Sequence, residues 1–216
     1  MLINIIYLLS FISTLIYVVF YFRKSFDINL RYFSAYLFFM FLLEVIAKYV
    51  KYLGYDNLWV YNSLTFIEFN CLFFFLIGVI LSIKIKKIVL YIVYIFNTIY
   101  ILTNIYYLWL EDYFVTYNSI ASISGSFLIS IVIFLFFRDF LNSDKILNYR
   151  KTLSFWISFG LLFYYLGTIP FTSIINFLNY IPQSSKIYLI KVQFFLTIFM
   201  YCCFIFGALW SQKRVK

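Results

Sequence analysis

Two carboxylates stand within long apolar stretches of the sequence, where a charged group needs a chemical reason. Glu44 is followed four residues later by Lys48, so the two side chains would share one helix face as an acid–base pair. Glu68 has no basic residue within reach on its own helix, where Thr65 lies one turn before it and Asn62 a further turn away. An ionisable residue inside a membrane span costs about 2.5 to 3.5 kcal/mol to insert, so each needs a partner or a function.

The two carboxylates lead to different interpretations. Glu44 and Lys48 form either a salt bridge that lowers the cost of insertion or the charged lining of a cavity, whereas the isolated Glu68 favours a functional site. Other apolar stretches bring polar residues to a similar outer depth, namely Asn97, Thr98, Thr103, Asn104, Asn118, Ser119, Ser122, Tyr164, Tyr165, Gly167 and Thr168. The sequence thus predicts a polar pocket opening outward, with ligand-binding candidates Glu68, Asn62, Thr65, Glu44, Lys48, Tyr164, Lys191 and Gln193. A core held by hydrogen bonds between helices would use some of the same residues, so both interpretations stay open.

The residue types that are missing exclude several chemistries. The chain contains no histidine, which removes histidine catalysis, histidine metal sites and the imidazole pH switch. The cysteines lack the spacing of a metal or redox site and are interpreted as small packing residues: Cys71, Cys202 and Cys203. We therefore expect no metal and no cofactor. The one catalytic hypothesis left is a carboxylate pair of Glu44 and Glu68, and a retinal site is disfavoured because Lys191 lies only about one turn into the last helix.

The composition identifies the elements that must position these residues. Hydrophobic residues make up 65% of the chain and charged residues only 12%, more apolar surface than a soluble domain of 216 residues could bury. The apolar runs are continuous over about 20 residues, unlike the alternating segments of about 10 residues in a β-barrel. The expected fold is therefore all-α, a polytopic membrane bundle of about seven transmembrane helices that forms a single domain over residues 1–216.

Lys and Arg between the apolar runs predict the orientation of the bundle. The expected spans cover residues 2–22, 32–53, 59–82, 88–110, 114–137, 153–178 and 188–210. With the N-terminus outside and the C-terminus in the cytoplasm, 13 of the 17 basic residues fall on the cytoplasmic side, while Glu111 and Asp112 fall outside. The same clusters account for the net charge of +9, so we expect a lipid bilayer and no nucleic acid as partner.

Two local features bear on packing and on the shape of a pocket. Small residues gather over residues 119–126, where Ser122 and Ser126 have the spacing that predicts close helix packing. Pro170 would free one backbone carbonyl in the sixth span and could shape a cavity there.

Three stretches together resemble a known family. The patterns YNSLTFIEF (residues 61–69) and FWISFGLLFYYLG (residues 155–167), with the last span, are similar to an uncharacterised family of small bacterial seven-helix membrane proteins. The resemblance covers nearly the whole chain and implies a multi-pass protein of the bacterial inner membrane. Asn62, Glu68, Trp156 and Tyr164 match its motif positions, whereas Gln193 stands where the family commonly has Asn.

Two functions outside catalysis remain open, and both are favoured over an enzyme. In the first, a small ligand binds the outward pocket and the bundle signals to a cytoplasmic partner through its basic inner loops. In the second, the protein transports a small solute with a three-plus-one-plus-three helix organisation, as in transporters with parallel repeats. Against transport, the sequence has no convincing internal repeat, and Pro182 with Gln183 is assigned to an outer loop rather than to a helix start.

Overall fold

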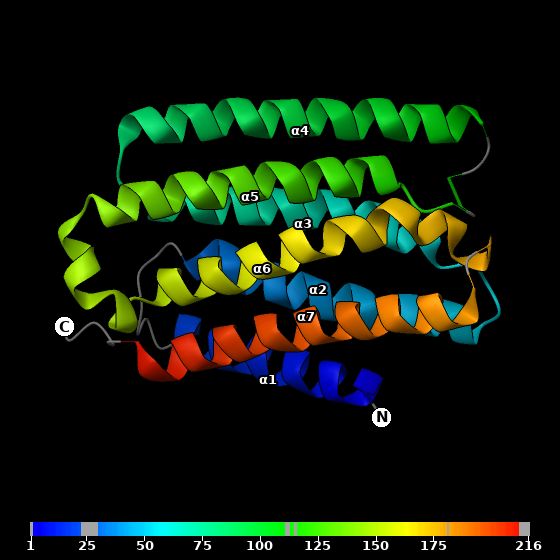
Figure 1. The fold of residues 1–216 in the computed structure, drawn as a ribbon, viewed down its shortest axis with the longest axis horizontal. Helices are drawn as coiled ribbons and strands as arrows, with labels where there is room; N and C mark the ends of the chain where they lie inside the picture. The colour runs from blue at the N-terminus through cyan, green and yellow to red at the C-terminus, as the bar shows by residue number, and fades with distance from the viewer. Residues whose placement is uncertain (1, 23–29, 111–112, 115, 181, 212–216) are drawn as a thin grey trace.

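The computed structural model describes residues 2–22, 30–110, 113–114, 116–180 and 182–211, and within them the chain is all-helical (Figure 1). The helices are α1 (Leu2–Phe22), α2 (Leu30–Tyr52), α3 (Leu58–Val79), α4 (Ile83–Trp109), α5 (Ser119–Leu141), α6 (Leu153–Ile174) and α7 (Gln183–Trp210), with the 3-10 helices η1 (Asp144–Lys151) and η2 (Ile175–Tyr180). The basic residues Arg23 and Lys24, the acidic pair Glu111 and Asp112, and the basic cluster at 213–216 lie outside the described residues.

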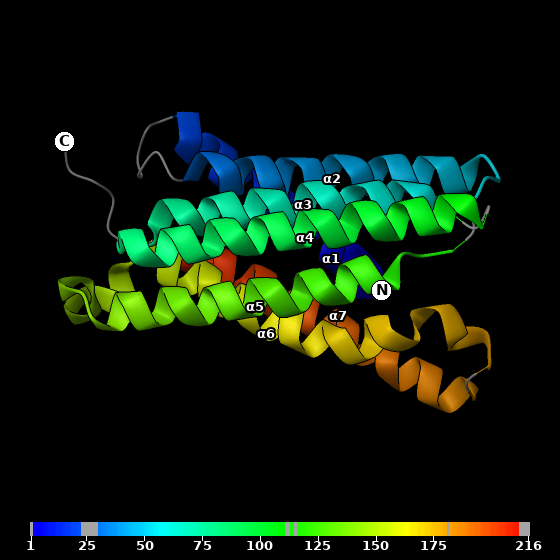
Figure 2. The same cartoon turned by 90° about the horizontal axis from the view of Figure 1, so that it is seen from above.

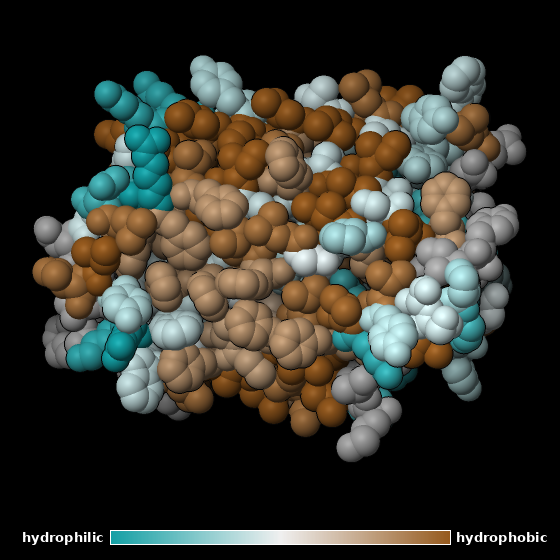
Figure 3. Space-filling view, viewed as in Figure 1, coloured by the Kyte–Doolittle hydropathy of each residue, from teal (hydrophilic) through white to brown (hydrophobic). Residues whose placement is uncertain are grey.

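Six of these helices are long and apolar enough to cross a membrane, which agrees with a multi-pass membrane protein. They are α2 to α7, whereas the apolar segment Asn4–Phe20 of α1 is shorter. Large apolar side chains also face outward along the bundle, including Phe38, Phe127 and Phe195. Figure 3 shows the result as a broad hydrophobic band between more polar ends, a surface suited to contact with lipid.

The helices form two layers of three, with one helix outside them (Figures 1 and 2). One layer follows the order α1, α2, α3 and the other the order α5, α6, α7; α3 packs on α5 and α1 packs on α7. These contacts close a ring of six helices. α4 packs on one edge of it, against α3 and α5, and 22% of its most apolar stretch is buried, the lowest share among the six apolar helices.

Polar side chains hold α4 against this edge. The side-chain amides of Asn70 in α3 and Asn97 in α4 donate to one another, with N···O distances of 3.0 and 3.2 Å. Further along, the Tyr100 hydroxyl donates to the backbone carbonyl of Asn62 at 3.1 Å. Hydrogen bonds between membrane helices contribute on average about 0.6 kcal/mol each, which supplements the small apolar contact of α4.

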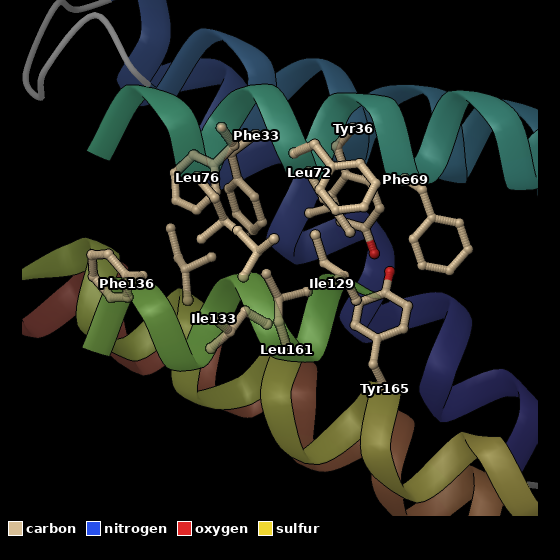
Figure 4. Close-up of a cluster of buried hydrophobic side chains, with 14 of the residues drawn as sticks. Phe33, Tyr36, Phe69, Leu72, Leu76, Ile129, Ile133, Phe136, Leu161 and Tyr165 are labelled. Atoms are coloured by element: carbon tan, nitrogen blue, oxygen red, sulfur yellow. The ribbon is translucent and has the colours of Figure 1, made fainter. Parts of the chain in front are cut away.

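Buried apolar side chains pack between the two layers (Figure 4). The ring of Phe33 in α2 lies 5.2 Å from that of Phe75 in α3 and 5.0 Å from that of Phe204 in α7. Ile133 and Phe136 of α5 complete the packing, and all five side chains are at most 2% exposed. Phe75, Phe136 and Phe204 come late in α3, α5 and α7. These three helices run towards the end of the bundle that carries Lys84, Lys86 and Lys87, so the cluster lies towards that end.

The helix bounds differ most from the expected spans at three helix starts. α5 begins at Ser119 rather than at residue 114, because the Asn118 side chain caps the helix by accepting a hydrogen bond from the amide of Ala121 at 3.0 Å. α4 begins at Ile83 rather than at residue 88, so Lys84, Lys86 and Lys87 belong to its first turns. Pro182 immediately precedes α7, and its carbonyl accepts from the amide of Lys186 at 3.1 Å, so the assignment of Pro182 and Gln183 to a loop was wrong.

Candidate functional site

A cavity of about 120 Å³ lies between α3, α5, α6 and α7. Nine of the twelve described residues that line it are polar: Glu68, Tyr117, Ser122, Ser126, Tyr164, Tyr165, Thr168, Thr172 and Gln193. Phe69, Phe171 and Ile175 complete the wall, and none of the twelve is Lys or Arg. A cavity of this size accommodates several water molecules or a solute of a few heavy atoms, and is too small for a drug-sized ligand.

Glu68 occupies the deep end of the cavity. It is the eleventh residue of α3, about 15 Å from Leu58 along the axis and close to the middle of the helix. Tyr165 of α6 donates its hydroxyl to Glu68 Oε1 at 2.6 Å, the short distance expected for a bond to a carboxylate. The Tyr165 ring packs 5.4 Å from that of Phe69, and its hydroxyl points towards that of Tyr36 from α2 (Figure 4). The carboxyl group of α3 at mid-depth is thus fixed by a hydrogen bond from α6.

Pairs of small polar residues one turn apart extend the cavity away from Glu68. Ser122 and Ser126 supply the wall from α5, and Thr168 and Thr172 supply it from α6. The two threonine hydroxyls donate to backbone carbonyls of their own helix, Thr168 to Tyr165 at 3.1 Å and Thr172 to Thr168 at 2.9 Å. Their oxygens therefore face the cavity chiefly as acceptors.

The far end of the cavity is formed by the connection before α5. Asn62 fixes this connection, since its amide nitrogen donates to the carbonyls of Tyr113 and Thr116, each at 3.0 Å, and its oxygen accepts from the amide of Asn118 at 2.8 Å. Asn176 holds it from η2 by donating to the carbonyl of Tyr117 at 3.0 Å. Burial raises the pKa of the Tyr117 phenol above its ordinary value, so this phenol keeps its proton.

The cavity gathers three of the predicted ligand-binding residues, Glu68, Tyr164 and Gln193. Asn62 and Thr65 are buried close by, but Asn62 is saturated by the bonds above and Thr65 donates to the carbonyl of Tyr61 at 3.0 Å. Neither lines the cavity.

The other predicted site residues lie elsewhere. Glu44 is on α2, outside the cavity wall, and Lys48 extends to α1, with its Nζ 5.0 Å from the centre of the Tyr7 ring. Among the described residues Glu44 and Lys48 form no ion pair, so that expectation was wrong; the aromatic ring supplies the contact instead. Lys191 is exposed and its Nζ lies 5.9 Å from the centre of the Tyr188 ring.

Close helix packing occurs beside the predicted pair of serines. Ser122 and Ser126 face the cavity, while Gly125 between them meets the ring of Phe69 from α3 so closely that a Cβ would lie 2.4 Å from a ring carbon. The same helix turn therefore supplies both the tight contact and the polar wall.

Several wall residues did not appear among the candidates drawn from the sequence. Ser126 and Thr172 repeat Ser122 and Thr168 one turn later, a periodicity that could have identified them. Tyr117 was assigned to a span from the sequence, whereas it lies in the connection before α5. No sequence pattern therefore indicated that it lines the cavity. Within the described residues no three Cys, Asp or Glu side chains come together as a metal site.

Comparison with known proteins identifies no relative. No protein-family model, no curated protein and no solved structure matches the chain. The resemblance to small bacterial seven-helix proteins therefore stays a prediction. Of its motif residues, Glu68 and Tyr164 line the cavity, and Trp156 donates its indole N–H to the carbonyl of Arg150 at 2.9 Å.

Proposed function

We propose that the protein is a multi-pass inner-membrane transporter of a small polar solute, which binds in the cavity beside Glu68. The observation that carries this proposal is the position of the deep end of the cavity, at mid-depth between two layers of three helices. Transporters built from repeats hold their substrate near the bilayer midplane, at the interface of the repeats.

The order of the helices supports the three-plus-one-plus-three organisation. In the ring of six, the contacts α1 with α2, α2 with α3 and α3 with α5 have counterparts in α5 with α6, α6 with α7 and α7 with α1. This order is compatible with a two-fold axis along the bundle, as in parallel repeats. α4 lies outside the ring, where a linker helix belongs, and Pro182 is the residue that caps the start of α7, which removes one sequence argument against transport.

The apolar cluster supports access from one side at a time. Phe33, Phe75 and Phe204 fill the space between Glu68 and the end that carries Lys84 and Lys87. A solute bound at Glu68 would leave on that side only after the two layers moved and opened the cluster. Movement of one layer against the other around a fixed site is the usual means of alternating access.

The proposed transporter crosses the membrane seven times, with the N-terminus outside and the C-terminus in the cytoplasm. We expect an impermeant thiol reagent to label Tyr55→Cys in intact cells and to leave Leu147→Cys unlabelled, in a background with Cys71, Cys202 and Cys203 replaced by Ala. Tyr55 and Leu147 are 68% and 82% exposed in connections at opposite ends of the bundle. Labelling after cell lysis is the control for reactivity, and the reverse pattern in intact cells would contradict the orientation.

Transport itself can be tested by filling the cavity. Ser126→Leu places an apolar side chain in the cavity wall, whereas Ser124→Leu makes the same change on α5 outside it. We expect vesicles containing wild type or Ser124→Leu protein to accumulate a solute from a panel of small polar compounds, and Ser126→Leu to reduce that uptake at least about tenfold. Equal uptake by both variants at equal protein content would count against this cavity as the transport site.

A ligand sensor acting with a cytoplasmic partner is the second candidate. It is favoured by the exposed cations at the end opposite the cavity, which include Lys84, Lys87, Arg138, Arg150 and Lys151. Such a surface suits an acidic partner. A sensor would bind the solute without moving it across the membrane, so the same vesicle experiment separates the two functions.

A further inference from the structure

The wall of the cavity presents several hydrogen-bond acceptors and one carboxyl group, together with serine and tyrosine hydroxyls that can donate or accept. The Glu68 carboxylate lies at its deep end, and the Thr168 and Thr172 oxygens face it after donating their hydrogens to the backbone. The side-chain oxygen of Gln193 is buried and has no hydrogen-bond partner within the described structure. A buried acceptor without a partner is unfavourable, so this wall suits an occupant that brings donors.

The ionisable groups of the wall also favour an occupant that carries hydrogen-bond donors and a positive charge. Glu68 is the one acidic residue among the described residues of the wall, and no Lys or Arg in the wall balances its ionised form. Rings of Phe69, Tyr117, Tyr164 and Phe171 make up much of the remaining surface. Aromatic faces attract ammonium groups, and this attraction is strongest where water is excluded.

We propose that the cavity binds a small primary ammonium ion, for which methylammonium is the simplest probe. The ammonium hydrogens would be donated to Glu68 and to wall oxygens within reach of it, while the aromatic rings surround the alkyl group. The volume of about 120 Å³ restricts the solute to a few heavy atoms, since a cavity of about 150 Å³ is filled by benzene. This inference rests on the proposed function, because it names the class of solute taken at the same site.

Thermal unfolding of the purified protein in detergent tests the inference. Methylammonium chloride, replacing an equal concentration of sodium chloride, should raise the melting temperature, because a ligand that binds only the folded state stabilises it. Methanol has a similar size without the charge and acetate carries the opposite charge, so neither should produce the shift. Glu68→Gln should weaken the apparent methylammonium affinity at least about tenfold, since it removes the buried partner charge. Glu44→Gln is the matched control, because it removes a carboxylate outside the wall, and its affinity should equal that of the wild type.

Three results would overturn the inference. The first is the absence of any shift with methylammonium, the second an equal shift with methanol or acetate, and the third an unchanged affinity in Glu68→Gln. These outcomes leave the transporter proposal standing, because the uptake panel includes neutral and anionic solutes. Uptake that Ser126→Leu leaves unchanged would instead remove the transport site, whichever ion stabilises the protein.

Discussion

Glu68→Gln is expected to abolish solute uptake while the protein remains folded and inserted. The amide oxygen of Gln can still accept the hydrogen bond that Tyr165 now donates to Glu68 at 2.6 Å, so the contact between α3 and α6 is preserved. The group that can carry a charge at the deep end of the cavity is lost. For a cationic solute, removing one partner of a buried, hydrogen-bonded charge pair costs at least about 2 kcal/mol, which corresponds to a reduction in binding of about 30-fold or more.

A paired assay separates this effect from loss of protein. Membrane abundance and uptake are measured on the same vesicle preparation for wild type, Glu68→Gln and Glu44→Gln. We expect all three proteins at equal abundance and only Glu68→Gln without uptake. Equal abundance together with normal uptake would reduce Glu68 to a structural hydrogen-bonding group and would remove the main support for a functional cavity. Glu68→Leu serves as a comparison in which the bond from Tyr165 is lost as well.

The second large effect is expected at Gly125, where folding rather than binding is at risk. A Cβ at this position would lie 2.4 to 2.7 Å from three atoms of the Phe69 ring, closer than carbon atoms pack. Gly125→Val must therefore push α5 away from α3 or force the ring of Phe69 out of its place, where it is only 1% exposed. Overpacking of this kind destabilises proteins by about 1 to 3 kcal/mol or more.

The measurement for Gly125→Val is the amount of folded protein after detergent extraction, together with its melting temperature. We expect a clear loss of both in the single variant and partial recovery in Gly125→Val with Phe69→Ala, which provides room for the new side chain. Ser124→Val is the control for valine on the same helix, outside the contact with Phe69. A double variant no better than Gly125→Val would show that the ring is not what limits this position.

The sequence predicts helices better than it predicts their partners. The expected first span coincides with α1, and the centres of the other six were also identified, because apolar runs of about 20 residues leave the chain few alternatives. The start of α5 was placed five residues too early, since the apolar residues Phe114 and Tyr117 look like a continuation of the helix. They instead belong to a connection that Asn62 holds, and a contact over more than fifty residues of sequence leaves no local pattern.

The absence of a local pattern for contacts between distant residues also explains which site residues could be identified from the sequence. Glu68 could be singled out because a carboxylate without a partner in its own helix is rare in a membrane span. Tyr36 and Tyr117 could not be chosen from 22 tyrosines, because only the packing of the layers brings Tyr36 towards Tyr165 and Tyr117 to the cavity wall. The prediction for Lys48 failed for a related reason. The spacing of four residues between Glu44 and Lys48 suits a salt bridge within α2, but it carries no information on the contact of Lys48 with the Tyr7 ring of α1.

The outlying helix α4 sets the direction in which α5, α6 and α7 cross the membrane. Three crossings are an odd number, so in the proposed topology the chain leaves α3 on the cytoplasmic side and α4 returns it to the outside before α5 begins. Without α4, α5 to α7 would insert in the opposite orientation. The basic residues around η1 would then lie on the outer side, against the positive-inside rule. A helix outside the ring of six thus makes it possible for both layers to be synthesised from one chain in the same orientation.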